Sequence, residues 1–209
     1  MDFLIALDHA HLDEPVFLKS LANTLGKLKG KKGIIVHSDS AYTDRIIQTG
    51  VMREEARRRA IKDLNNRLIA LLADNGVAAV GLNAYQQDIV TRNQSGWNIK
   101  ADYLQSFPEG VQLVLSTLIA EKEMDHPQPA GLSELLEQLA PALGTSQVIT
   151  FTKLDAEEVF AQNASDLPIY TSETGQNSEL LNRHLPEELK SLSIPLVVTS
   201  SGSLGELFS

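Results

Sequence analysis

The chain has 209 residues, of which 43% are hydrophobic and 22% are charged, and its formal net charge is −9 at pH 7. This composition is typical of a folded globular protein with one substantial core, and it argues against intrinsic disorder. The negative charge disfavours DNA and RNA as partners, and the lack of cysteine excludes disulfides, thiolate catalysis and cysteine metal sites.

Two further features bear on cellular location. The N-terminal sequence lacks the basic segment and the long apolar run of a secretory signal. No apolar stretch approaches the roughly 20 residues that a membrane-spanning helix needs. We therefore expect a cytoplasmic protein with no membrane or nucleic-acid partner.

The beginning of the chain predicts a strand, a helix and a second strand. Phe3–Leu7 is a short apolar run typical of a buried strand. Pro15 opens a helical pattern whose apolar residues repeat on one face as far as Leu28. After a turn-like basic stretch, Ile34–Val36 is a second buried strand. This unit predicts a parallel pair of strands joined by a helical crossover.

The next part of the chain contains its longest helical pattern. A short helix at about residues 42–48 precedes it, and the pattern itself runs over about residues 53–74 and stops at an Asn-Gly pair. Val77–Leu82 predicts a third strand. Residues 83–110 are polar and irregular, and we interpret them as a hairpin or a lid-like excursion.

The second half of the chain continues the alternation of strands and helices. Strands are predicted at Val111–Ile119, at Val148–Phe151, near Ile169 and at Leu196–Thr199; helical segments are predicted at Leu132–Leu143, at about residues 156–162, near Pro186–Leu192 and from Ser203. The fold class predicted by this order is a three-layer α/β/α sandwich with a mainly parallel sheet, in which Phe3–Leu7, Ile34–Val36, Val77–Leu82 and Val148–Phe151 are central. Ligands of such sheets bind beyond the carboxyl ends of the strands.

Several short sequences stand at those strand ends and turns. They are Ala6-Leu7-Asp8-His9, His37-Ser38-Asp39-Ser40, Val80-Gly81-Leu82, Thr152-Lys153-Leu154-Asp155 and the closing turn Ser201–Leu207. In order and position they resemble the amino-acid kinase family, and acetylglutamate kinase in particular. The first two strands of that family end in Lys-x-Gly-Gly and His-Gly-Gly-Gly. The resemblance implies an amino-acid kinase-like fold, ATP with Mg²⁺ as phosphate donor, and a homodimer built through the helix at residues 53–74.

The residues that would handle phosphate differ from the family pattern. Ala6 stands in place of the family lysine, and Asp8 and Asp39 stand in place of glycines. Phosphoryl transfer needs backbone amides and positive charge close to the phosphate oxygens, and glycine permits that close approach. Lys153 stands where the family has an aspartate, and the segment after Val159 is shorter than the family pattern. We therefore expect weak or absent kinase activity.

The candidate ligand-binding residues are those that follow the predicted strands. They are Asp8, His9, His37, Ser38, Asp39, Ser40, Asn83, Lys153 and Asp155. His9, His37 and Asp39 are of types that ligate metal ions, but a hydrogen-bonded polar rim explains them better, and we expect no metal. If Asp8, His37 and Asp39 converge, the pKa of His37 should rise between the two carboxylates. No residue is assigned a catalytic role.

The sequence favours a divergent acetylglutamate kinase-like protein, weak or inactive as a kinase, that binds a small metabolite or acts as a partner subunit and requires no cofactor. Two alternatives stay open. One is an active carboxylate kinase that uses ATP and Mg²⁺, with Lys100 or Lys153 supplying positive charge. The other is a purely structural subunit of a homodimer. In each case we expect one domain over residues 1–209, with a first lobe of about 1–125 and a shortened second lobe of about 126–209.

Overall fold

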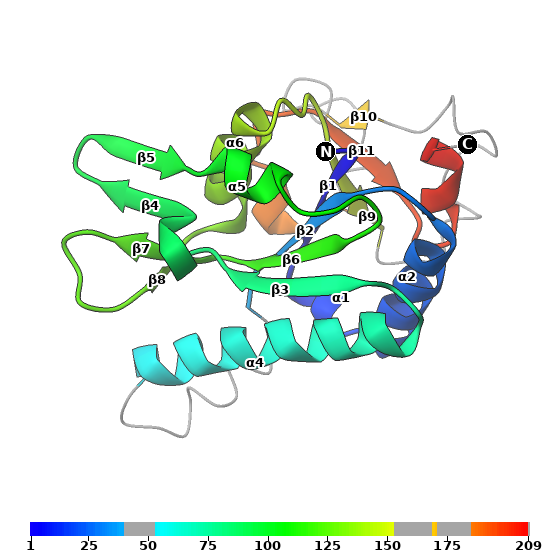
Figure 1. Cartoon of the computed structure of the whole chain (residues 1–209), viewed down its shortest axis with the longest axis horizontal. Coiled ribbons are helices and arrows are strands. Elements are labelled where there is room, and N and C mark those ends of the chain that lie inside the picture. The colour runs from blue at the N-terminus through cyan, green and yellow to red at the C-terminus, as the bar shows by residue number, and fades with distance from the viewer. Residues whose placement is uncertain (40–52, 153–168, 171–184, 209) are drawn as a thin grey trace.

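The computed structural model describes residues 1–39, 53–152, 169–170 and 185–208. Its main sheet has seven strands in the order β10-β11-β9-β1-β2-β6-β3 (Figure 1). Every neighbouring pair is parallel except β10 with β11. The strands are β1 (Phe3–Leu7), β2 (Gly33–His37), β3 (Ala79–Asn83), β6 (Gln112–Ser116), β9 (Val148–Phe151), β10 (Ile169–Tyr170) and β11 (Leu196–Thr199).

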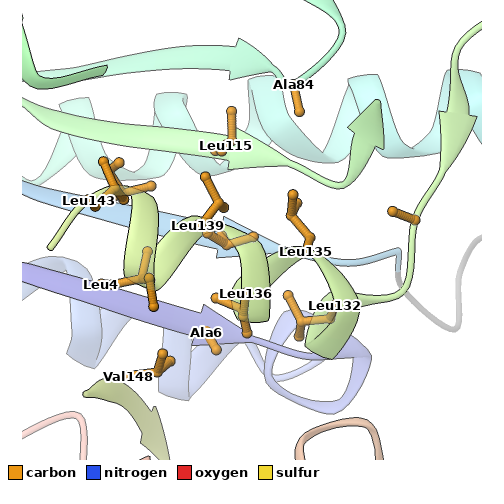
Figure 2. Close-up of a cluster of buried hydrophobic side chains, with 14 of the residues drawn as sticks. Leu4, Ala6, Ala84, Leu115, Leu132, Leu135, Leu136, Leu139, Leu143 and Val148 are labelled. Carbon is orange, nitrogen blue, oxygen red and sulfur yellow. The ribbon is translucent and has the colours of Figure 1, made fainter. Parts of the chain in front are cut away.

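Helices cover both faces of this sheet. Helices α2 (Pro15–Lys27) and α4 (Arg53–Asp74) pack on one face, and α6 (Leu132–Ala142) packs on the other (Figures 1 and 2). The buried leucines of α6 recur at helical spacing, which gives this helix one continuous apolar face. The predicted three-layer α/β/α sandwich with a mainly parallel sheet is therefore confirmed.

Strand β1 shows why the central strands are apolar throughout. Its side chains alternate between the two layers. Leu4 and Ala6 lie in the core under α6, as Figure 2 shows, whereas Ile5 and Leu7 lie in the core under α2 and α4. Because both faces are covered, all five residues of the strand are buried. Ala6, which stands in place of the family lysine, is thus a core residue packed beneath α6.

Close packing of α4 on the sheet depends on one glycine. A Cβ atom at Gly81 of β3 would lie 2.0 Å from Cδ1 of Ile69 and 2.3 Å from Oδ1 of Asn65. Any larger residue would push α4 away from β3, and glycine permits the close approach. This close contact fixes the position of Asn65 over the sheet.

A smaller sheet extends from the main one and has the strand order β5-β4-β7-β8. Its strands are β4 (Val90–Asn93), β5 (Gly96–Ile99), β7 (Leu118–Glu121) and β8 (Gln128–Pro129), and the short elements η1 (Gln86–Asp88) and α5 (Ala101–Gln105) flank the β4–β5 hairpin. Arg92 lies over the ring of Trp97, 5.1 Å from its centroid, and forms ion pairs with Glu121 and Glu134. These contacts attach the hairpin to β7 and to α6. Strands β4 and β5 pair antiparallel, so of the hairpin or lid-like excursion predicted for residues 83–110 the hairpin is confirmed.

Several element predictions need correction. The expected strand Val111–Ile119 divides at Thr117, so that β6 lies in the main sheet and β7 in the smaller one. Strand β3 is at the end of the strand order, not central. The chain forms only short 3₁₀ turns, η5 (Glu187–Leu189) and η6 (Ser203–Phe208), where two helices were predicted. The helical segments expected at residues 42–48 and 156–162 lie outside the described residues.

No helix in the described part of the chain is long and apolar enough to cross a membrane.

Candidate functional site

Polar residues gather where the parallel strands of the main sheet end. Asp8 follows β1, Ser38 and Asp39 follow β2, Asn83 ends β3, and Ser116 ends β6. The backbone pairing continues just beyond the strands, since the amide of Ser38 donates to the carbonyl of Leu7 at 3.2 Å. All these residues therefore lie at one edge of the sheet, as predicted from the order of elements.

Asp8 is a fully buried carboxylate that begins the short helix α1 (His9–Leu12). Its Oδ1 accepts a hydrogen bond from the backbone amide of His11 at 3.1 Å and lies 2.8 Å from Nδ1 of the same residue. Nε2 of His11 in turn lies 2.8 Å from the carbonyl oxygen of Phe151, at the end of β9. Burial tends to raise the pKa of Asp8, but the hydrogen bonds and charge of His11 outweigh it and lower that pKa below its usual value. Asp8 is therefore an ionised group that joins β1 to β9.

His37 is also fully buried, and its ring contacts α4. Its Nδ1 lies 2.9 Å from the carbonyl oxygen of Ser38, and its Nε2 lies 3.1 Å from Nδ2 of Asn65. Burial lowers the pKa of His37 from 6.5 to about 4, against smaller opposing effects of the Ser38 carbonyl and Asp39. The expectation that His37 carries positive charge between two carboxylates is wrong, because α4 seals the ring away from water.

Asp39 has a different partner from the one expected. Its Oδ2 accepts a hydrogen bond of 2.7 Å from Nε of Arg57, near the start of α4. Arg57 lies 18 residues from Asp39 along the chain, so the local sequence did not indicate this pairing. Ser38 is buried, and its hydroxyl donates to the carbonyl of Asp39 at 3.2 Å. The end of β2 is therefore held by an ion pair to α4.

Glu188 is a site residue that the sequence did not reveal. It lies on the turn η5 and is partly buried, with Oε2 inaccessible and without a hydrogen-bond partner. Burial raises the pKa of Glu188, and the charges of Asp8 and Asp39 raise it further, whereas His9 and the Ser38 side chain act in the opposite direction. A lone glutamate in a polar segment carries no signal of such a position, because only tertiary packing brings it to the ends of β1 and β2.

Of the other candidates, Asn83 and His9 lie in the described part of the chain. Asn83 closes the edge between two strands: its Oδ1 accepts a hydrogen bond of 2.8 Å from the Ser116 hydroxyl, and its amide donates to Oε1 of Gln86 at 2.7 Å. His9 is about half exposed, and its Nδ1 lies 3.7 Å from Oδ2 of Asp8. The remaining candidates, Ser40, Lys153 and Asp155, lie outside the described residues.

The arrangement does not support the metal site considered for His9, His37 and Asp39. Both ring nitrogens of His37 have polar partners, and Asp39 is paired with Arg57. Within residues 1–39, 53–152 and 185–208, no group of three or more histidine or acidic side chains is arranged to hold a metal ion. What the described edge presents is a set of three carboxylates, of Asp8, Asp39 and Glu188, opposite one arginine. The Asp8 carboxylate is buried among these groups, and the Asp39 carboxylate is paired with Arg57.

Comparison with known proteins relates this fold to a family. The sequence of residues 4–156 matches the model of the amino acid kinase family. No protein of curated function matches the sequence significantly. Among solved structures, the chain is similar to an aspartate kinase from Synechocystis, with a TM-score of 0.66 and 14% identity over 96% of this chain and 38% of that one.

Two other structures extend the comparison. An N-acetylglutamate synthase from Neisseria gonorrhoeae, complexed with coenzyme A and L-arginine, has a TM-score of 0.66 and 14% identity over 99% of this chain and 58% of that one. An isopentenyl phosphate kinase from T. acidophilum has a TM-score of 0.55 and 11% identity over 96% of this chain and 92% of that one. The chain thus spans well under two thirds of the first two relatives, and the likeness at this identity concerns the fold. With the family match over residues 4–156, the chain belongs to the amino acid kinase family.

Proposed function

We propose that this chain is a divergent, acetylglutamate kinase-like member of its family that does not transfer phosphate. In this proposal it binds a small metabolite at the strand ends or serves as a partner subunit, and it acts in the cytoplasm as a single two-lobed domain without a required cofactor. The resemblance to acetylglutamate kinase in particular rests on the sequence patterns at the strand ends.

The observation that carries this proposal is the Asp8 carboxylate. It is fully buried at the end of β1, its pKa is lowered by His11 despite burial, and it occupies the position at which the family resemblance expects a glycine. A phosphate group approaching this edge would face the charges of Asp8 and Asp39. It would also find the core residue Ala6 in place of a lysine. Phosphoryl transfer depends on the opposite charge at this place.

Two other functions remain as alternatives. An active kinase would need positive charge from Lys100 or Lys153. Nζ of Lys100 donates to the carbonyl of Gln87, which holds it beside η1. A purely structural subunit would need no ligand at all. Titration with nucleotides and acylated amino acids separates these two alternatives, because an active kinase should bind both ligands and a purely structural subunit should bind neither.

We predict that MgATP binds more weakly than about 1 mM, which corresponds to a binding free energy smaller than about 4 kcal/mol. Isothermal titration calorimetry measures this directly. Phosphate transfer to N-acetylglutamate, aspartate and isopentenyl phosphate should be at background. A micromolar dissociation constant for MgATP would contradict the proposal.

The Asp8→Asn variant tests the cause of this exclusion. Asparagine caps helices as well as aspartate does, so the fold of α1 should persist while one negative charge is lost. We expect inorganic phosphate to bind about fivefold more tightly, as for the loss of one repulsive charge worth ~1 kcal/mol. Asp125→Asn, in an exposed loop, is the matched control and should change nothing. Equal affinities for both variants would mean that Asp8 does not repel the anion.

We also propose a homodimer that forms through α4 (Arg53–Asp74), as the family resemblance implies. Light scattering at micromolar concentration should give twice the mass of the chain, 22.8 kDa. Glu substitution of the exposed Ala70 on α4 should shift the mass toward the monomer, because it adds charge to the proposed contact. A monomer in the wild-type protein would refute the proposal.

A further inference from the structure

We propose that a groove along the outer face of α2 binds a small organic dicarboxylate. The groove has a volume of about 570 Å³, which is within the range of small-molecule sites. Seven of its lining residues come from α2, and the eighth, Gly202, belongs to the turn after β11. Among the described residues, none of the strand-end candidates lines this groove, so the site is separate from that edge of the sheet.

Positive charge is the first feature that points to an anionic ligand. Lys19 and Lys27 both line the groove, and helical rise places their Cα atoms about 12 Å apart along α2. Both lysines are exposed, and neither forms an ion pair with another residue of the described chain. At ordinary ionic strength charges farther away than about 8 Å are largely screened, so these lysines outweigh the net negative charge of the protein. Two separated cations fit a ligand with a negative group at each end.

Hydrogen-bond donors lie between the two lysines. Asn23 is four residues from each of them and so faces the same side of α2, and its exposed side chain forms no hydrogen bond with the described residues. The hydroxyl of Ser20 accepts a hydrogen bond of 2.8 Å from the Ser201 hydroxyl, so its own O–H can donate into the groove. No acidic side chain of the described chain lines the groove. Its polar groups therefore suit carboxylate oxygens.

An exposed apolar side chain distinguishes a dicarboxylate from a compact anion such as phosphate. Val16 lines the groove and is 81% exposed, which is unusual for a large hydrophobic residue of the described chain. A ligand with a short methylene chain can cover part of Val16 while its two carboxylates reach the lysines, and such burial of apolar surface is favourable. Inorganic phosphate offers neither the apolar chain nor two separated charges.

The test is titration of the ¹⁵N-labelled protein with glutarate, followed by two-dimensional amide NMR at an ionic strength of about 0.15 M. We expect saturable shifts with a millimolar dissociation constant, largest for the amides of residues 16–27 and 201–203. Butyrate, which lacks the second carboxylate, and inorganic phosphate should each bind about threefold or more weakly than glutarate. Lys19→Gln and Lys27→Gln should each weaken glutarate binding about threefold, and the double variant about tenfold.

Lys29→Gln is the matched control, because Lys29 is exposed just beyond the end of α2 and does not line the groove. It removes the same charge and should leave the affinity within about 1.5-fold of wild type. Equal losses in Lys27→Gln and Lys29→Gln would indicate diffuse attraction to surface charge and would overturn the site, as would the lack of saturable shifts below about 20 mM glutarate.

The positions of the shifts keep this site distinct from the metabolite site proposed at the strand ends. Shifts confined to residues 37–39 and 83 would support binding at the strand ends and overturn the groove on α2. Shifts on α2 that Lys27→Gln weakens would support the groove, whatever the strand ends bind.

Discussion

Replacement of Asn65 by leucine should lower the free energy of unfolding by about 3–5 kcal/mol. Asn65 is buried on α4, and its Nδ2 lies 3.1 Å from Nε2 of His37, 3.1 Å from the carbonyl of Val114 and 3.3 Å from the carbonyl of Leu82. Leucine has a similar size but no donor, so His37 would lose its partner in a site that water does not reach. A buried polar group left without a partner costs roughly 1–3 kcal/mol.

Urea unfolding followed by circular dichroism measures this effect. Asn66→Leu is the matched control, because Asn66 is exposed on the same turn of α4 and should change stability by less than about 0.5 kcal/mol. A loss below about 1 kcal/mol at Asn65 would mean that the contacts from α4 to the three strands contribute little to stability.

Acidification should destabilise the protein by about 3 kcal/mol through His37 alone as the pH falls from 6.5 to 4. In the folded protein burial lowers the pKa of His37 to about 4, against 6.5 for an exposed histidine. Between these values the unfolded chain binds the proton and the folded protein does not, so stability falls as the pH falls. Above pH 6.5 the contribution is complete and no longer changes.

The variant His37→Gln isolates this effect, because its stability should lack this dependence on pH. Glu188 acts in the opposite direction in the acidic part of the range, since its raised pKa favours proton uptake by the folded protein. The difference between wild type and variant removes that contribution. His126→Gln, in an exposed loop, is the control and should keep the wild-type slope. If the free energy of unfolding depends on pH in the same way for wild type and His37→Gln, His37 is not a neutral group with a lowered pKa.

The sequence by itself determined most of the elements and their order. Strands β1, β9 and β11 and helix α4 lie at the residues predicted for them, because apolar runs and helix stop signals are local properties. The alternation of those elements was sufficient to predict a parallel α/β/α sandwich and to bring Asp8, Ser38, Asp39 and Asn83 to one edge of it.

Only the tertiary structure decided what each side chain does at that edge. The ring of His37 turns to Asn65 on α4, Asp39 pairs with Arg57, and Glu188 reaches the end of β1 from the far part of the chain. The sequence predicted the opposite charge state for His37, because a pKa depends on burial by neighbouring elements and not on the order of residues. The division of one apolar run at Thr117 has a similar cause, since a change of sheet depends on pairing partners that lie elsewhere in the chain.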